Sequence, residues 1–126
     1  MLDKASLVAF VPSTDLDRSE GFYVGTLGLE RIEVNPFALV LRAGGTMLRV
    51  TRVGDLRPQP FTVLGWDVPD LRGTLAELVA RDVPVLRFDG IGQDETGVWT
   101  TPGGDLVAWF ADPDGNTLSL TQFASH

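Results

Sequence analysis

The stretch that decides the fold is Val107-Ala108-Trp109-Phe110-Ala111-Asp112-Pro113-Asp114-Gly115-Asn116-Thr117-Leu118-Ser119-Leu120-Thr121, near the end of the sequence. Asp112, Pro113 and Gly115 occupy the first, second and fourth positions of a type I turn, where a side-chain acceptor, a fixed φ and a flexible exit are favoured. On both sides of the turn the residues alternate between two sets, as they do in strands with two different faces. The stretch therefore predicts a β-hairpin.

The residues before this hairpin predict a strand, a helix and two short strands. The strand spans residues 61–68, and Asp70 follows it as a helix N-cap. Asp82 stands where a left-handed residue ends a helix, and Asp tolerates that conformation better than most residues. One face of the helix carries Leu71, Leu75, Leu78 and Val79. The remaining expected segments are strands at 85–88 and 97–101 and a polar loop at 89–96.

The same order of elements occurs earlier in the chain. Thr14 offers an N-cap with Asp17 three residues on, which is an acidic variant of the capping box. Gly28 is expected to end this helix. The apolar side of the helix is formed by Leu16, Phe22, Tyr23 and Leu27. Strands are expected at 6–11, 29–34, 37–42 and 46–52, with a Gly-Gly-bearing hairpin between the last two.

The sequence thus predicts one α+β domain, residues 1–126, built from two tandem βαβββ modules. The modules span about 1–53 and 61–126, and residues 54–60 form the linker. Because each module has one helix and a sheet with a single apolar face, neither buries its core well alone. Side by side, the modules would form a curved mixed sheet around a cavity, with the helices outside. A ferredoxin-like sandwich is the alternative.

Composition limits the possible partners. The net charge is −7 and the sequence pI is near 4.4, which argues against nucleic acid because phosphates require a basic surface. The chain has no cysteine, and its single histidine is the last residue, His126. No apolar stretch is long enough to span a bilayer, so we expect no membrane contact and a cytoplasmic protein.

The motifs carry a resemblance to a known family. Asp15-Leu16-Asp17-Arg18-Ser19-Glu20-Gly21-Phe22-Tyr23, followed by Leu27-Gly28-Leu29, resembles the opening motif of the vicinal oxygen chelate superfamily. This superfamily includes glyoxalases, bleomycin-resistance proteins and extradiol dioxygenases. Phe110 with Asp112-Pro113-Asp114-Gly115-Asn116 resembles its closing motif. The resemblance implies two βαβββ modules, a pocket within curved sheets, and a homodimer.

In metal-dependent members of this superfamily, His, Glu or Gln side chains on four inner strands hold a divalent ion. Counted from the motifs, the corresponding positions here are Val8, Arg49, Val63 and Ser119. Two of these side chains cannot coordinate a metal, arginine is a permanent cation, and serine is a poor ligand. The resemblance therefore implies the scaffold without its metal site, and we expect no metal and no cofactor.

The inner faces instead predict a pocket for an organic ligand. Strand alternation places four sets of residues on one face each, namely Met47, Arg49 and Thr51, then Val63, Gly65 and Asp67, then Val107, Trp109 and Ala111, then Thr117, Ser119 and Thr121. Trp109 could stack on a flat ligand while Arg49 binds its anionic group. Alternatively, Arg49 and Asp67 pair with each other and Trp109 fills core. Trp99 is either a lid or a packing residue. The candidate ligand-binding residues are Arg49, Asp67, Trp109, Ser119, Val63, Met47, Val8 and Trp99.

Two functions from different classes follow. One is a metal-independent protein that binds a planar or anionic small molecule, like the drug-sequestering proteins of the superfamily. The other is a glyoxalase-like lyase or isomerase that uses general acid–base catalysis, with Asp67, Glu95 or Tyr23 carrying the proton. No Ser-His-Asp or Cys-His arrangement can be built from these residues.

Overall fold

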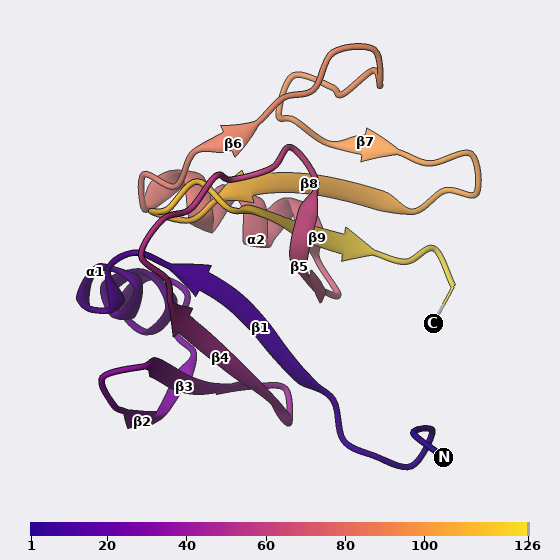
Figure 1. Cartoon of the computed structure of the whole chain (residues 1–126). Coiled ribbons are helices and arrows are strands. Elements are labelled where there is room, and N and C mark those ends of the chain that lie inside the picture. The colour runs from indigo at the N-terminus through magenta and orange to yellow at the C-terminus, as the bar shows by residue number, and fades with distance from the viewer. Residues whose placement is uncertain (126) are drawn as a thin grey trace. The chain divides into compact units, whose positions relative to one another are not determined.

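A computed structural model describes residues 1–125 as two compact units, the first spanning Met1–Pro58 and the second beginning at Gln59. Each unit contains one β-sheet with helical segments on one face (Figure 1). The predicted α+β class with two βαβββ modules is therefore confirmed. None of the helices within residues 1–125 is long and apolar enough to cross a membrane.

The first unit has a four-stranded mixed sheet in the order β1-β4-β3-β2. β1 pairs with β4 in parallel, and the other neighbours are antiparallel. The elements are β1 (Val8–Ser13), α1 (Leu16–Glu20), a π-helical segment (Gly21–Thr26), β2 (Glu30–Val34), β3 (Ala38–Ala43) and β4 (Thr46–Arg52). The core on the helix side includes Val11, Tyr23, Leu39, Leu41 and Val50, each fully buried.

The first helix begins one residue later than the sequence predicts. Its N-cap is Asp15, whose carboxylate accepts a hydrogen bond from the Arg18 backbone N–H at 3.1 Å, so the prediction of Thr14 as the N-cap is wrong. Ser13 contributes to this shift because its hydroxyl accepts from the Asp15 N–H. The helix ends as predicted at Gly28, which has a φ of 79° that favours glycine.

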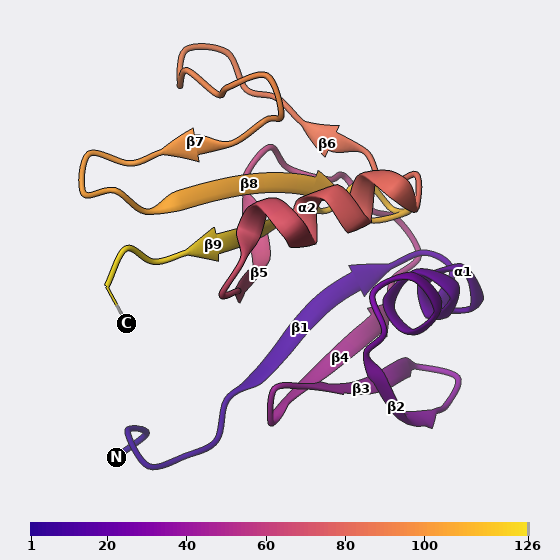
Figure 2. The same ribbon diagram turned by 180° about the vertical axis from the view of Figure 1, so that it is seen from behind.

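The second unit has a five-stranded sheet in the order β5-β9-β8-β6, and β7 pairs with another part of β8. β5 and β9 are parallel, which repeats the β1–β4 pairing of the first unit. The elements are β5 (Thr62–Asp67), α2 (Leu71–Ala80), β6 (Val85–Leu86), β7 (Trp99–Thr100), β8 (Leu106–Ala111) and β9 (Thr117–Gln122). Figure 2 shows α2 lying across one face of this sheet, where it contacts β8 and β9.

The caps of α2 follow the prediction. Asp70 accepts from the Gly73 N–H at 3.1 Å, and Asp82 adopts a left-handed φ of 62° after the helix. Of the four residues assigned to one face of the helix, Leu71, Leu75 and Leu78 are buried, whereas Val79 is 53% exposed. Val79 instead lines a hollow beside the helix.

The β8–β9 hairpin is organised by the side chain of Asp112. Gly115 donates its N–H to the Asp112 carbonyl at 2.9 Å, as the predicted turn requires. The Asp112 carboxylate accepts from the backbone N–H groups of Asp114 and Asn116 and from the Asn116 side-chain amide. Because Asp112 is only 5% exposed, these bonds satisfy a buried charge and fix the register of β8 against β9.

Candidate functional site

The open face of the second sheet lies opposite α2 and carries the residues that alternation places there. Trp109 stands beside Ser119, Val107 beside Thr121, and Ala111 beside Thr117 in the β8–β9 ladder. This register confirms the predicted grouping. Trp66 lies on the other face, where its ring stacks on Phe110 with centroids 6.0 Å apart. Trp66 therefore packs on the face opposite the open one.

An aromatic cluster forms around Trp109 on the open face. The Trp99 ring stacks on the Trp109 ring at a centroid distance of 6.2 Å and an interplanar angle of 24°. Phe88 meets Trp109 edge-on at 5.3 Å and 86°. These rings adjoin a hollow of about 380 Å³, within the range of small-molecule sites. Its lining consists of Pro60, Phe61, Phe88, Ile91, Trp99 and Trp109. We call this hollow the aromatic cavity.

A β-bulge fixes the orientation of the Trp109 indole. The β5–β9 register shifts between Thr62 and Leu64, and this shift places Thr62 opposite Thr117 on the open face. The indole Nε1–H then donates to the Thr62 hydroxyl at 3.1 Å. Strict alternation from Gly65 assigns Thr62 to the opposite face, so sequence reasoning missed this residue.

The hydroxyl of Ser119 packs over a glycine. Gly65 lies opposite Ser119 in the ladder, and a Cβ added to Gly65 would stand 2.6 Å from Ser119 Oγ. Ser119 is itself only 8% exposed. Because Gly65 has no side chain, the Ser119 hydroxyl fits beside it on the open face of the sheet.

The connection between β6 and β7 supplies one wall of the aromatic cavity. Gln93 accepts from the Phe88 N–H at 2.7 Å and donates to the carbonyls of Leu86 and Gly97 at 3.0 and 2.7 Å. The side-chain amide of Gln93 therefore makes the hydrogen bonds that a neighbouring strand would otherwise make with these three backbone groups. Because Phe88 and Ile91 lie within this closed loop, Gln93 positions them against Trp109.

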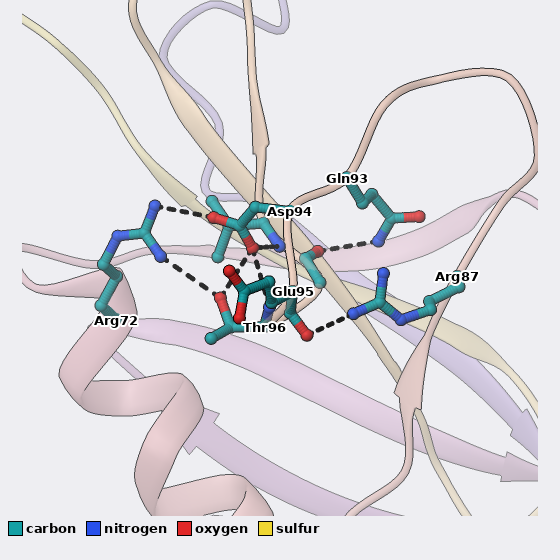
Figure 3. A network of polar contacts seen from close by, with 8 residues as sticks. Arg72, Arg87, Gln93, Asp94, Glu95 and Thr96 are labelled. Atoms are coloured by element: carbon teal, nitrogen blue, oxygen red, sulfur yellow. Dashed lines mark hydrogen bonds and ion pairs between the residues drawn. The ribbon is translucent and has the colours of Figure 1, made fainter.

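Asp94 ties the same loop to α2. Its carboxylate accepts from the Thr96 hydroxyl, from the backbone N–H groups of Thr96 and Val98, and from Arg72 of α2 at 3.0 Å (Figure 3). The hydrogen bond from the Thr96 hydroxyl, followed by those from Val98 and Arg72, holds the pKa of Asp94 well below its usual value. The loop between β6 and β7 is thus anchored at both Gln93 and Asp94.

Three of the predicted ligand-binding residues lie on the first unit. Val8, Met47 and Arg49 share the open face of its sheet, where Val8 stands opposite Met47 and Phe10 stands opposite Arg49. Val8 is exposed, whereas Met47 and Arg49 are half-buried. Val40 flanks Arg49 on the other side. The predicted Arg49–Asp67 pair would join the two units and stays a prediction.

The three candidate proton carriers occupy separate places. Tyr23 is completely buried in the first unit and contacts the edge of Phe22. Asp67 lies in the second unit and lines a hollow of about 400 Å³ together with Gln122 and Phe123. Glu95 lines a different hollow, which lies beside α2. Neither carboxylate belongs to the lining of the aromatic cavity.

The four positions that hold a metal in related proteins do not fit one here. Val8 and Val63 offer no donor atom, Arg49 carries a positive charge, and Ser119 offers a neutral hydroxyl. Within residues 1–125, no group of three or more His, Cys, Asp or Glu side chains could hold a metal ion. His126 lies outside the described residues.

Tandem βαβββ units with parallel β1–β4 and β5–β9 pairs place the chain in the class of α+β proteins built from this repeated module. Residues 6–120 match the family model described as "Glyoxalase/Bleomycin resistance protein/Dioxygenase superfamily". The chain therefore belongs to this superfamily, as its motifs predict. No curated protein matches the chain significantly.

Solved structures share the fold over nearly the whole chain. A bleomycin resistance determinant encoded on the transposon Tn5 matches with a TM-score of 0.75 and 21% identity, covering 96% of this chain and 99% of that one. A superfamily member from Sphaerobacter thermophilus matches with a TM-score of 0.74 and 21% identity, covering 98% and 100%. A lactoylglutathione lyase from Agrobacterium tumefaciens matches with a TM-score of 0.73 and 19% identity, covering 95% of each chain. At these identities the likeness extends to the fold alone.

Proposed function

We propose that this protein binds a planar organic molecule in the aromatic cavity without the help of a metal ion. The observation that carries the proposal is the Trp99–Trp109 stack with Phe88 at its edge, bordering a hollow of about 380 Å³. Aromatic faces that border such a hollow favour stacking by flat ligands. The unsuitable donor set at the four family positions supports the metal-independent part of the proposal.

The direct test replaces Trp109. Trp109→Ala removes the stacking surface, so the affinity for the planar probe 2-naphthoate should fall by about 1.5–3 kcal/mol, or roughly tenfold to a hundredfold, in a calorimetric titration. Trp66→Phe is the matched control, because Trp66 lies on the opposite face of the sheet. Equal affinities for wild type and Trp109→Ala would remove the aromatic cavity from the proposal.

Arg49 is proposed to bind an anionic group on the open face of the first sheet. Its strand neighbours Phe10 and Val40 are apolar, so the guanidinium has little competition from acceptors beside it in the sheet. Arg49→Ala should weaken an anionic probe such as 2-naphthoate by about 1.5–3 kcal/mol and leave the neutral probe 2-naphthamide unaffected. A similar loss for both probes would assign Arg49 a purely structural role.

A homodimer is part of the proposal, as the family resemblance implies. Val8 and Phe10 on the open face of the first sheet are 43% and 60% exposed, and a partner would remove this apolar surface from water. Light scattering that returns the monomer mass at working concentrations would contradict this part.

A further inference from the structure

A second cavity lies on the other side of the second sheet, beside α2. It has a volume of about 630 Å³, larger than the aromatic cavity. Its lining consists of Arg72, Leu75, Ala76, Val79, Val83, Val85, Arg87, Glu95 and Thr96. We call it the helix-side cavity. Residues 85–88 separate the two cavities, because Val85 and Arg87 line the helix-side cavity while Phe88 lines the aromatic one.

The charged groups of the helix-side cavity differ in how they are paired. Arg72 is neutralised by Asp94, 3.0 Å away. Arg87 donates to the backbone carbonyl of Glu95, which is a neutral acceptor (Figure 3). Among residues 1–125, neither the Arg87 guanidinium nor the Glu95 carboxylate takes part in an ion pair. One cation and one anion are therefore available to a ligand.

Apart from Thr96, the rest of the lining is apolar. Leu75, Ala76 and Val79 come from α2, and Val83 and Val85 come from the residues that follow it. Val79 is 53% exposed, so a ligand that covers it would remove apolar surface from water. This combination fits a molecule with a hydrophobic body and a polar end.

We propose that the helix-side cavity binds a small zwitterion with an apolar side chain, of which a branched-chain α-amino acid is the simplest example. The ligand carboxylate would bind Arg87, its ammonium group would bind Glu95, and its side chain would lie on Leu75, Val79 and Val83. A simple anion would meet the Glu95 carboxylate, and a simple cation would meet Arg87, so either is disfavoured by like-charge repulsion.

Calorimetric titration of the full chain with L-leucine tests the proposal, because this probe has no ring to stack on Trp109. Saturable binding to L-leucine is expected. The two half-molecules, 4-methylpentanoate and 3-methylbutylamine, should bind at least roughly tenfold more weakly, since each lacks one charge-assisted hydrogen bond. No saturable binding of L-leucine, or equal binding of either half-molecule, would overturn the proposal.

Variants locate the site. Arg87→Gln should weaken L-leucine roughly tenfold, and Glu95→Gln should weaken L-leucine while strengthening 4-methylpentanoate. Ala76→Trp should block binding by filling the cavity, and circular dichroism will show whether the helix is retained; Ala76 is exposed, so the fold should tolerate the change. Trp109→Ala should leave the L-leucine affinity unchanged. If L-leucine affinity falls with Trp109→Ala, the ligand lies in the aromatic cavity and the proposal is wrong.

Discussion

The two units share a strand order and a pairing pattern but differ in one connection. In each, the first and last strands are parallel and the hairpin before the end is antiparallel. The first unit passes from β2 to β3 through residues 35–37, whereas the second passes from β6 to β8 through residues 87–105. The longer connection contributes Phe88, Ile91 and Trp99 to the aromatic cavity.

This difference indicates that the strand pairing is common to the two units, whereas the connection between β6 and β8 supplies residues that line the aromatic cavity. Trp109 lies at the same level of its sheet as Val40 does in the first unit: Trp109 pairs with Ser119, and Val40 pairs with Arg49. Trp109, unlike Val40, contacts aromatic residues of the connection between β6 and β8, namely Phe88 and Trp99. The longer connection thus adds β7 and residues that line the aromatic cavity, while the pairing of the other four strands matches that of the first unit.

Substitution of Asp112 in the β8–β9 turn should give the largest loss of stability. Asp112→Ala should lower the free energy of unfolding by about 3 kcal/mol, because it leaves the buried N–H groups of Asp114 and Asn116 without their acceptor. Urea denaturation followed by far-ultraviolet circular dichroism measures this change. A loss below about 1 kcal/mol would contradict the role assigned to the Asp112 carboxylate.

The matched turn of the first unit serves as the control. Gly45 has a φ of 84°, and a Cβ added there would meet no atom within 4 Å. Gly45→Ala should therefore cost only the backbone strain, about 1 kcal/mol. If Asp112→Ala and Gly45→Ala lower the free energy of unfolding by the same amount, the Asp112 side chain contributes no more to its hairpin than the backbone of Gly45 contributes to the other one.

Substitution of Gln93 should lower stability by an intermediate amount. The loss should be confined to the connection between β6 and β7 and should not reach the first sheet. Gln93→Ala removes hydrogen bonds from the Phe88 N–H and from the Leu86 and Gly97 carbonyls, so local stability should fall by about 2 kcal/mol. Hydrogen exchange should accelerate at the Phe88 amide and remain unchanged at the amides of β3 and β4.

Gln93→Glu is the conservative control, since it keeps the acceptor for the Phe88 N–H and removes both donors. Protection of Phe88 should lie between that of wild type and that of Gln93→Ala. Unchanged exchange in both variants would show that the loop is held by other groups.

Substitution of Asp94 should have the smallest effect on stability, and the size of this effect should depend on pH. Because the pKa of Asp94 in the folded protein lies below its usual value of 3.8, its carboxylate stabilises the loop above that pH. This contribution is lost as the pH falls below 3.8 toward the depressed pKa. Thermal denaturation between pH 5 and about pH 2 should show a steeper loss for wild type than for Asp94→Asn. Parallel pH curves for the two proteins would contradict the assignment.

Much of the fold could be predicted because the decisive residues act locally. Asp70, Asp82 and Gly28 end or begin helices through their own backbone preferences and short-range hydrogen bonds. The N-cap error at Thr14 arose because Thr14 and Asp15 are adjacent and both residue types cap helices, and the Ser13 hydroxyl holds Asp15 in the capping position. The strand predicted at 85–88 shortened to Val85–Leu86 because Gln93 takes the place of a strand partner for Phe88.

The site was less predictable because it depends on contacts between distant segments. Trp109 and Ser119 follow from alternation along a regular hairpin. Thr62 reaches the same face only through a bulge, and Phe88 reaches it only because Gln93 folds the connection back. Aromatic residues next to a strand end or within a Gly-bearing loop, such as Phe61 and Phe88, are the signal that could have identified this cavity.

Titration of metal-free protein with 2-naphthoate, in the presence and absence of EDTA, tests the central claim most directly. Quenching of tryptophan fluorescence should saturate with one ligand per chain and should be identical under the two conditions, because the stacked indoles form the binding surface. Binding that disappears with EDTA and returns with a divalent ion would contradict the account.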